Sequence, residues 1–133
     1  MKALKIKGTL ETPEIKFNGK TGIFLISGIS IPENITLFYY PIIEWIKDYA
    51  YSPQRETTLK INMDYFNTPS SKMLLDIFET FKLMHDIGHK VIINWYYDED
   101  DECMQIAGED YSDIVGIPFN LISCKAKAMV KVF

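Results

Sequence analysis

The sequence predicts an α/β protein: a small single domain with a mixed sheet and helices mainly on one face. Three observations favour this class. The chain has 133 residues, the size of one ordinary domain. Its hydrophobic share of 47% is enough for a core. Its apolar residues recur with the period of strands in some segments and of helices in others. No repeat or linker divides residues 1–133, and the role of the tail, residues 124–133, stays open.

Short strands and a hairpin are predicted for the first part of the chain. Apolar residues alternate in residues 4–10, and a second short strand is predicted over residues 14–17. The Asn-Gly-Lys sequence of residues 18–20 indicates a tight turn, because Asn and Gly accept positive φ angles. The apolar run of residues 22–28 predicts an inner strand that returns along this hairpin.

Helices and strands are predicted to alternate in the middle of the chain. A helix begins at residues 32–34, and Pro41 either kinks it or marks the first turn of its better half. Residues 58–65 alternate as a core strand, and residues 70–87 carry one apolar stripe at helical spacing. Residues 91–97 form a third core strand. Strands joined through a helix make right-handed crossovers, the plan of the anti-sigma-factor-antagonist (STAS) domains, an analogy of fold alone.

The last part of the chain is less clearly patterned. Eight carboxylates lie among residues 98–113. We interpret this acidic loop as a solvated face that attracts a basic partner surface. A short strand or a helical turn is predicted both for residues 118–122 and for residues 129–133.

Composition excludes several classes of function. A net charge of −4 argues against nucleic-acid binding, which needs a basic surface. No apolar run approaches transmembrane length, so membrane insertion is not expected. Cys103 and Cys124 form no C-x-x-C pair, and no signal peptide is evident, so free thiols in the cytoplasm are expected. No cofactor is expected.

The sequence DYFNTPSSK, residues 64–72, places several hydroxyls between a predicted strand and a predicted helix. Thr68 precedes a proline and is therefore pushed toward extended geometry. Pro69 suits the first position of a helix. We thus expect Thr68 to be the N-cap, accepting from the N–H of Ser70 or Ser71. This structural role needs no further function.

The same corner is also a candidate for phosphorylation. A helix N-terminus tolerates an added anion, and a phosphate on Thr68 would add about −1.5 to −2 of charge at the surface. Ser70 and Ser71 are rival acceptors. A nucleophilic role for Thr68 is disfavoured, because His85 and His89 lie roughly 25 Å away along the helix.

Several sequence blocks together resemble the SiaC family of bacterial regulatory phosphoproteins. They are ETPEIKF (11–17), SGISIPENITLFYYPIIEWIKDY (27–49), DYFNTPSSK (64–72), NWYYDEDDE (94–102) and AGEDY (107–111). The resemblance implies a STAS-like fold and a phosphosite at Thr68. Pro69 departs from the small hydroxyl residue common in the family at that position, which changes what a kinase would meet.

The resemblance also implies a partner switch without enzymatic activity of its own. A partner Ser/Thr kinase would phosphorylate Thr68, and a PP2C-type phosphatase would reverse this. The unphosphorylated form would bind and activate a diguanylate cyclase in cyclic-di-GMP signalling. We expect the docking surface around Thr68 to comprise Tyr65, Phe66, Asn67, Ser70 and Ser71.

Two alternatives remain open. The switch could act on a sensor kinase or an anti-sigma-type factor. A protein of another class, a small enzyme or metal-binding protein, could instead use the acidic residues 98–110. Their spacing imitates a calcium loop, but Cys103 stands where such a loop requires glycine. The motif HDIGH (85–89) imitates a zinc motif, but Gly88 is expected to end the helix before His89. Of the adjacent Tyr39 and Tyr40, only one can face the core.

Overall fold

The computed structural model describes residues 2–125. Its strands are β1 (Leu4–Ile6), β2 (Glu14–Asn18), β3 (Ile23–Ser30), β4 (Glu56–Phe66), β5 (Lys90–Asp98) and β6 (Phe119–Cys124). Its helices are α1 (Ile35–Ala50), α2 (Thr68–Asp86) and α3 (Glu102–Val115). The predicted strand at residues 129–133 lies outside the described residues.

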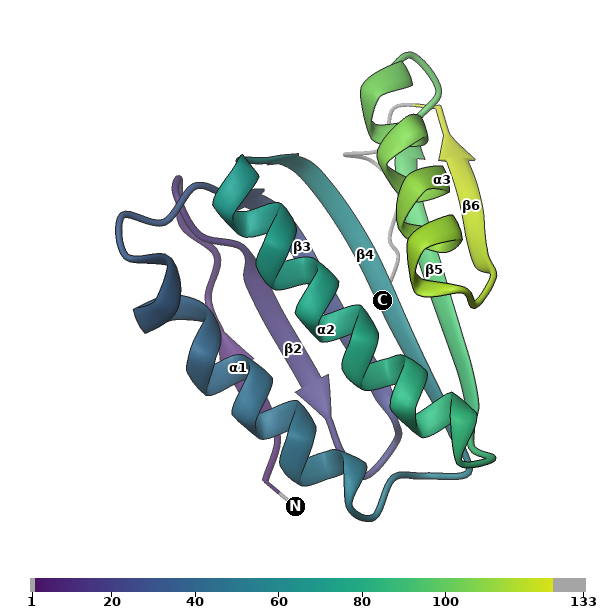
Figure 1. The fold of residues 1–133 in the computed structure, drawn as a ribbon. Coiled ribbons are helices and arrows are strands. Elements are labelled where there is room, and N and C mark those ends of the chain that lie inside the picture. The colour runs from purple at the N-terminus through teal and green to yellow at the C-terminus, as the bar shows by residue number, and fades with distance from the viewer. Residues whose placement is uncertain (1, 126–133) are drawn as a thin grey trace.

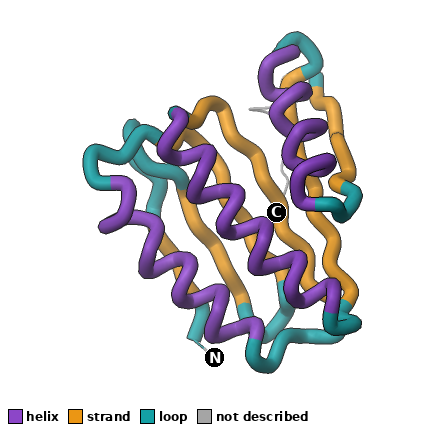
Figure 2. Tube along the Cα trace, in the orientation of Figure 1, coloured by secondary structure: helices purple, strands orange, loops and turns teal. Residues whose placement is uncertain are grey.

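The six strands form one mixed sheet in the order β1-β2-β3-β4-β5-β6. The first three are antiparallel neighbours, and β3 to β6 run parallel. Each parallel connection passes through a helix, and all three helices cover the same face of the sheet (Figures 1 and 2). The predicted fold class, a mixed sheet with helices on one face, is therefore confirmed.

Helix α3 corrects the prediction of a long acidic loop. The Asp101 side chain accepts from the N–H of Met104 at 3.0 Å and caps the helix. Met104, Gly108, Tyr111 and Val115 are the buried residues of α3, spaced three and four apart along one face. The carboxylates occupy the other faces, so the high charge of the segment concealed a short apolar stripe. Of residues 118–122, left open between strand and turn, residues 119–122 belong to β6 and Pro118 precedes it.

The first predicted strand is shorter than its alternating sequence indicated. Strand β1 ends at Ile6, and Leu10 is 87% exposed. The Thr9 hydroxyl accepts from the backbone N–H groups of Glu11 and Thr12 at 3.1 and 3.0 Å, so these residues turn instead of pairing with β2.

The core lies between the helices and the sheet, with Trp95 and Phe78 among its largest fully buried side chains. Tyr39 is fully buried whereas Tyr40 is 56% exposed, so the two tyrosines divide as expected. Pro41 lies inside α1 on its exposed side. None of the helices within residues 2–125 has the length and apolarity needed to cross a membrane.

Candidate functional site

Asn67 forms the corner between β4 and α2 and caps the helix. Its backbone is extended, and its side-chain oxygen accepts from the N–H of Ser70 at 3.0 Å. The prediction that Thr68 is the N-cap is therefore wrong. Thr68 is the first helical residue, because the cap and first-turn bonds outweigh the bias against helical geometry before a proline. Pro69 is the second helical residue. A backbone N–H at this position has no acceptor within the helix, so the missing N–H of proline costs no hydrogen bond.

The three hydroxyls of the corner have different environments. Thr68 is exposed. Ser71 is half-buried, and its hydroxyl donates to the carbonyl oxygen of Thr68 at 2.7 Å. Ser70 has no exposed surface. Ser70 therefore presents no surface to a partner or a kinase in this folded structure, and its part in docking or as a phosphate acceptor stays a prediction.

Ser70 belongs to a buried chain of hydroxyl groups that sequence reasoning missed. Its hydroxyl donates to the backbone carbonyl of Ser30 at 3.0 Å. The Ser30 hydroxyl must then donate to the Ser70 oxygen, 2.8 Å away, and accept from the hydroxyl of Tyr39 at 2.5 Å. Burial raises the pKa of Tyr39, which keeps this donor protonated. The chain is fully satisfied and ties α1, β3 and α2 together beneath Thr68.

Backbone contacts hold the corner against neighbouring elements. The carbonyl oxygen of Ser30 accepts a second bond, from the N–H of Asn67, at 3.1 Å. On the other side, the Tyr111 hydroxyl of α3 donates to the carbonyl oxygen of Ser71 at 2.7 Å. Burial raises the pKa of Tyr111. The first turn of α2 is thus fixed from two sides while the Thr68 side chain stays outside.

Apolar side chains are exposed beside this corner. Tyr65 is 56% exposed, as the predicted docking surface requires. Phe66 instead is half-buried, with its ring 6.2 Å from that of Trp95. Ile31, 38% exposed, donates a backbone bond from its N–H to the carbonyl of Glu11, next to the exposed Leu10. Leu10 and Ile31 were missed, because only the fold brings them near Asn67.

The other candidate sites lose their geometric basis. The imitation of a calcium loop fails because the helix α3 starts at Glu102, within the supposed loop. Helix α2 ends at Asp86, and Gly88 has a φ of 102°, so His85 and His89 do not share a helical face. Across residues 2–125 there is no cluster of three His, Cys, Asp or Glu side chains suited to a metal ion.

Replacing Asn67 by Ala is expected to lower the free energy of unfolding by about 1 kcal/mol, because the N–H of Ser70 loses its acceptor. Urea denaturation followed by circular dichroism measures this loss. Thr68→Ala is the matched control and should lie within about 0.5 kcal/mol of the wild type, because no bond from the Thr68 side chain supports the helix start. A larger loss of stability in Thr68→Ala than in Asn67→Ala would show that Thr68 is the N-cap.

Comparison with known proteins gives consistent results. A sequence model described as SiaC family regulatory phosphoprotein matches residues 6–124. An uncharacterized protein of Pseudomonas aeruginosa (strain UCBPP-PA14) is 30% identical over 119 residues, which cover 90% of this chain and 94% of that protein.

Solved structures agree with this match. SiaC of Pseudomonas aeruginosa superposes with a TM-score of 0.85 at 28% identity, covering 93% of this chain and all of that one. A structure of the diguanylate cyclase SiaD in complex with its activator SiaC, from the same organism, matches with a TM-score of 0.86 at 29% identity. It covers 91% of this chain and 99% of the matched chain.

Proposed function

The chain belongs to the SiaC family of regulatory phosphoproteins, and from this premise we propose that its unphosphorylated form binds and activates a diguanylate cyclase. The observation that carries the proposal is the similarity to a SiaC that was solved in complex with the cyclase SiaD, of which it is the activator. The protein would act as a regulator of cyclic-di-GMP synthesis and not as an enzyme.

Phosphorylation of Thr68 would switch this activity off. Thr68 is exposed at the first position of α2, whereas Ser70 is buried and Ser71 is half-buried and bonded. The positive end of the helix dipole faces an anion at this position, so the domain would stay folded. A partner Ser/Thr kinase would add the phosphate, and a PP2C-type phosphatase would remove it.

The proposed docking surface combines apolar contacts with the switch residue. It keeps Tyr65, Phe66, Asn67 and Ser71 from the sequence prediction, and it gains the exposed side chains of Leu10 and Ile31. A phosphate with about −1.5 to −2 of charge keeps its hydration water. Burying it against apolar side chains is costly, so phosphorylation would oppose docking of the cyclase.

A charge at Thr68 tests this function. Thr68→Asp is expected to weaken binding of the cognate cyclase at least about tenfold and to reduce its activation, whereas Thr68→Ala should bind like the wild type. Calorimetry and a cyclase assay with purified components measure both effects.

Thr36→Asp is the control for an added charge, because Thr36 is also an exposed threonine in the first turn of a helix. Its hydroxyl donates to Asn34 at 3.0 Å, so circular dichroism first checks that the variant is folded. Equal binding by Thr68→Asp and the wild type would contradict the switch. Failure of the unmodified protein to bind the cyclase would contradict the proposal that a diguanylate cyclase is its effector. Capture of a sensor kinase or an anti-sigma-type factor would support the alternative target.

We propose that phosphorylation and cyclase binding take place in the cytoplasm, where the free thiols of Cys103 and Cys124 would stay reduced.

A further inference from the structure

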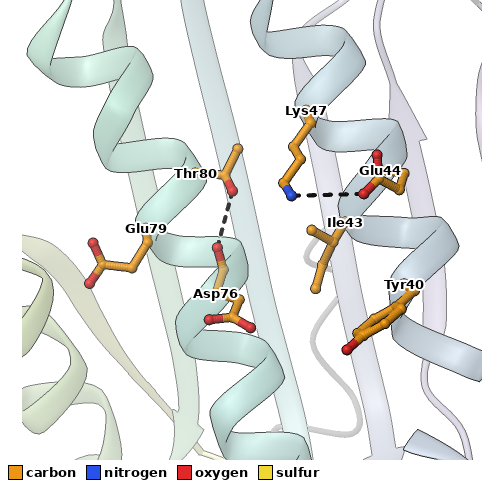
Figure 3. A pocket seen from close by; sticks show the side chains of 7 residues that line it. All are labelled: Tyr40, Ile43, Glu44, Lys47, Asp76, Glu79 and Thr80. Atoms are coloured by element: carbon orange, nitrogen blue, oxygen red, sulfur yellow. Dashed lines mark hydrogen bonds and ion pairs between the residues drawn. The ribbon is translucent and has the colours of Figure 1, made fainter. Parts of the chain in front are cut away.

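Helices α1 and α2 lie side by side on the sheet and leave a groove between their outer faces (Figure 3). A cavity of about 460 Å³ is lined by residues of both helices: Tyr40, Ile43, Glu44, Lys47, Asp76, Glu79 and Thr80. An adjoining cavity of about 320 Å³ shares Lys47 and Thr80 and continues to Ala50, Tyr51 and Leu83. We call these two cavities together the α1–α2 groove.

The α1–α2 groove is mainly polar in its larger cavity and mainly apolar in the smaller one, with apolar side chains at both ends. Ile43 and Thr80 are each 7% exposed and form its floor. Tyr40 lies at one end with 56% exposure, and Tyr51 and Leu83 lie at the other with 89% and 65%. Large exposed side chains gathered along one groove indicate a surface that binds a partner.

The walls of the α1–α2 groove are acidic. Glu44, Asp76 and Glu79 contribute three carboxylates against the single ammonium of Lys47. Lys47 lies 3.7 Å from Glu44 in an exposed pair, which is weak and leaves the carboxylate of Asp76 uncompensated beside the groove. The side chain of Glu79 is directed away from the space between the helices (Figure 3). Figure 3 shows the side chains of Asp76 and Tyr40 directed into the space between the helices.

We propose that the α1–α2 groove is a second docking surface, which receives an amphipathic helix carrying Lys or Arg beside apolar side chains on a partner protein. The length of α1 from Tyr40 to Tyr51 corresponds to roughly 16 Å, or three helical turns of the partner. Apolar residues of that helix pack on Ile43, Tyr40 and Leu83. Its cations pair with the carboxylates of the walls, as charge complementarity requires.

This surface is separate from the corner around Thr68. Asp76 lies two turns further along α2, about 12 Å away. The unmodified corner presents exposed apolar side chains such as Tyr65, whereas the groove is lined by carboxylates, so the two surfaces suit partners of different chemistry. The protein thereby offers two docking surfaces, of which one is switched by charge. This inference does not depend on the identity of the effector at the corner.

A synthetic peptide of 18 residues tests the groove. It carries Leu and Lys at amphipathic helical spacing and a fluorescein label, and its control has Glu in place of every Lys. In fluorescence anisotropy the Lys peptide should bind and the Glu peptide should not. High salt should weaken binding, because the charges are exposed. Failure of the Lys peptide to bind would overturn the proposal.

Charge reversal locates the site. Glu44→Lys with Asp76→Lys should lower the peptide's affinity at least about tenfold. Glu109→Lys with Asp113→Lys, on the exposed face of α3, changes the net charge equally and should alter affinity less than about twofold. Equal losses in both double variants would show unspecific attraction and overturn the proposal.

Two further measurements distinguish the α1–α2 groove from the Thr68 corner and from a dimer interface. Amide chemical shifts should move at Tyr40, Lys47 and Thr80 when the Lys peptide binds. Thr68→Asp should leave the peptide's affinity within about twofold, whatever it does to the cyclase. Loss of peptide binding in Thr68→Asp would show that the peptide binds at the Thr68 corner and not at a separate surface. Dimerisation through the groove in the absence of peptide would show that a second copy of the chain occupies it. Either result would overturn the proposal.

Discussion

Replacing Ser70 by Asp is expected to lower the free energy of unfolding by about 3–5 kcal/mol at pH 7, a large part of the stability of a domain of this size. The new carboxylate would lie with no exposed surface, facing the oxygens of Ser30. It would break the hydroxyl chain from Tyr39 and bury an unpaired charge. Urea denaturation, with circular dichroism as the signal, measures the loss.

The pH dependence identifies the charge as the cause. Burial raises the pKa of the introduced carboxyl above its value in the unfolded chain, about 3.9. The unfolded state is therefore more ionised, and the destabilisation is complete at neutral pH. It shrinks as pH falls through the raised pKa of the folded state, so the variant should regain stability relative to the wild type on acidification.

Two controls accompany this experiment. Ser70→Asn introduces a side chain with the shape of Asp but without its charge. Its loss of stability relative to the wild type should therefore be independent of pH between about 4 and 7. Thr68→Asp carries the same charge on an exposed residue and should unfold within about 0.5 kcal/mol of the wild type. A stable Ser70→Asp protein at pH 7 would show that the corner opens and would restore Ser70 as a phosphate acceptor.

The contrast between Thr68 and Ser70 also shows what the sequence could predict of the site. The corner, its proline and its run of hydroxyls follow from local patterns between an alternating strand and a periodic helix. The burial of Ser70 depends on Ser30, forty residues earlier, which β3 brings beside the corner. Nothing local distinguishes these serines. The one available signal was Tyr39, at core spacing in α1, whose buried hydroxyl needs a partner.

The cap was misplaced by one residue for a local reason. Both Asn67 and Thr68 are good N-cap residues, and the rule for a residue before proline favoured Thr68. Asn67 wins because its backbone N–H also bonds to the carbonyl of Ser30, which holds it in extended geometry at the end of the strand. A tertiary contact decided between two locally adequate caps.

Helix α3 was missed because composition obscured its pattern. Its buried face includes a glycine, Gly108, which carries no hydrophobic signal and has a poor helix propensity. In the fold this glycine allows the helix backbone to approach the indole of Trp95, whose N–H donates to the carbonyl of Met104 at 3.0 Å. The feature that weakened the helical prediction is the one that permits the helix to dock.

Replacing Gly108 by Val is accordingly expected to cost about 3 kcal/mol of stability. A Cβ at this position would lie 2.6 Å from Cδ1 of Trp95 and 2.8 Å from a methyl carbon of Leu121. Trp95 is fully buried among aromatic neighbours and cannot withdraw without opening a cavity. Urea denaturation followed by tryptophan fluorescence measures both the stability and the changed environment of the indole.

Glu109→Val separates the clash from helix propensity. It places the same branched side chain at the neighbouring exposed position of α3, where the cost is the propensity difference of about 0.5 kcal/mol. At Gly108, by contrast, the loss of a helical glycine is itself favourable, so any destabilisation there comes from the contact with Trp95. Similar stabilities of the two variants would mean that α3 docks without close approach at Gly108. Because Tyr111 of the same helix bonds to Ser71, displacement of α3 in Gly108→Val should also loosen the first turn of α2 and weaken the proposed binding of a cyclase at the corner around Thr68.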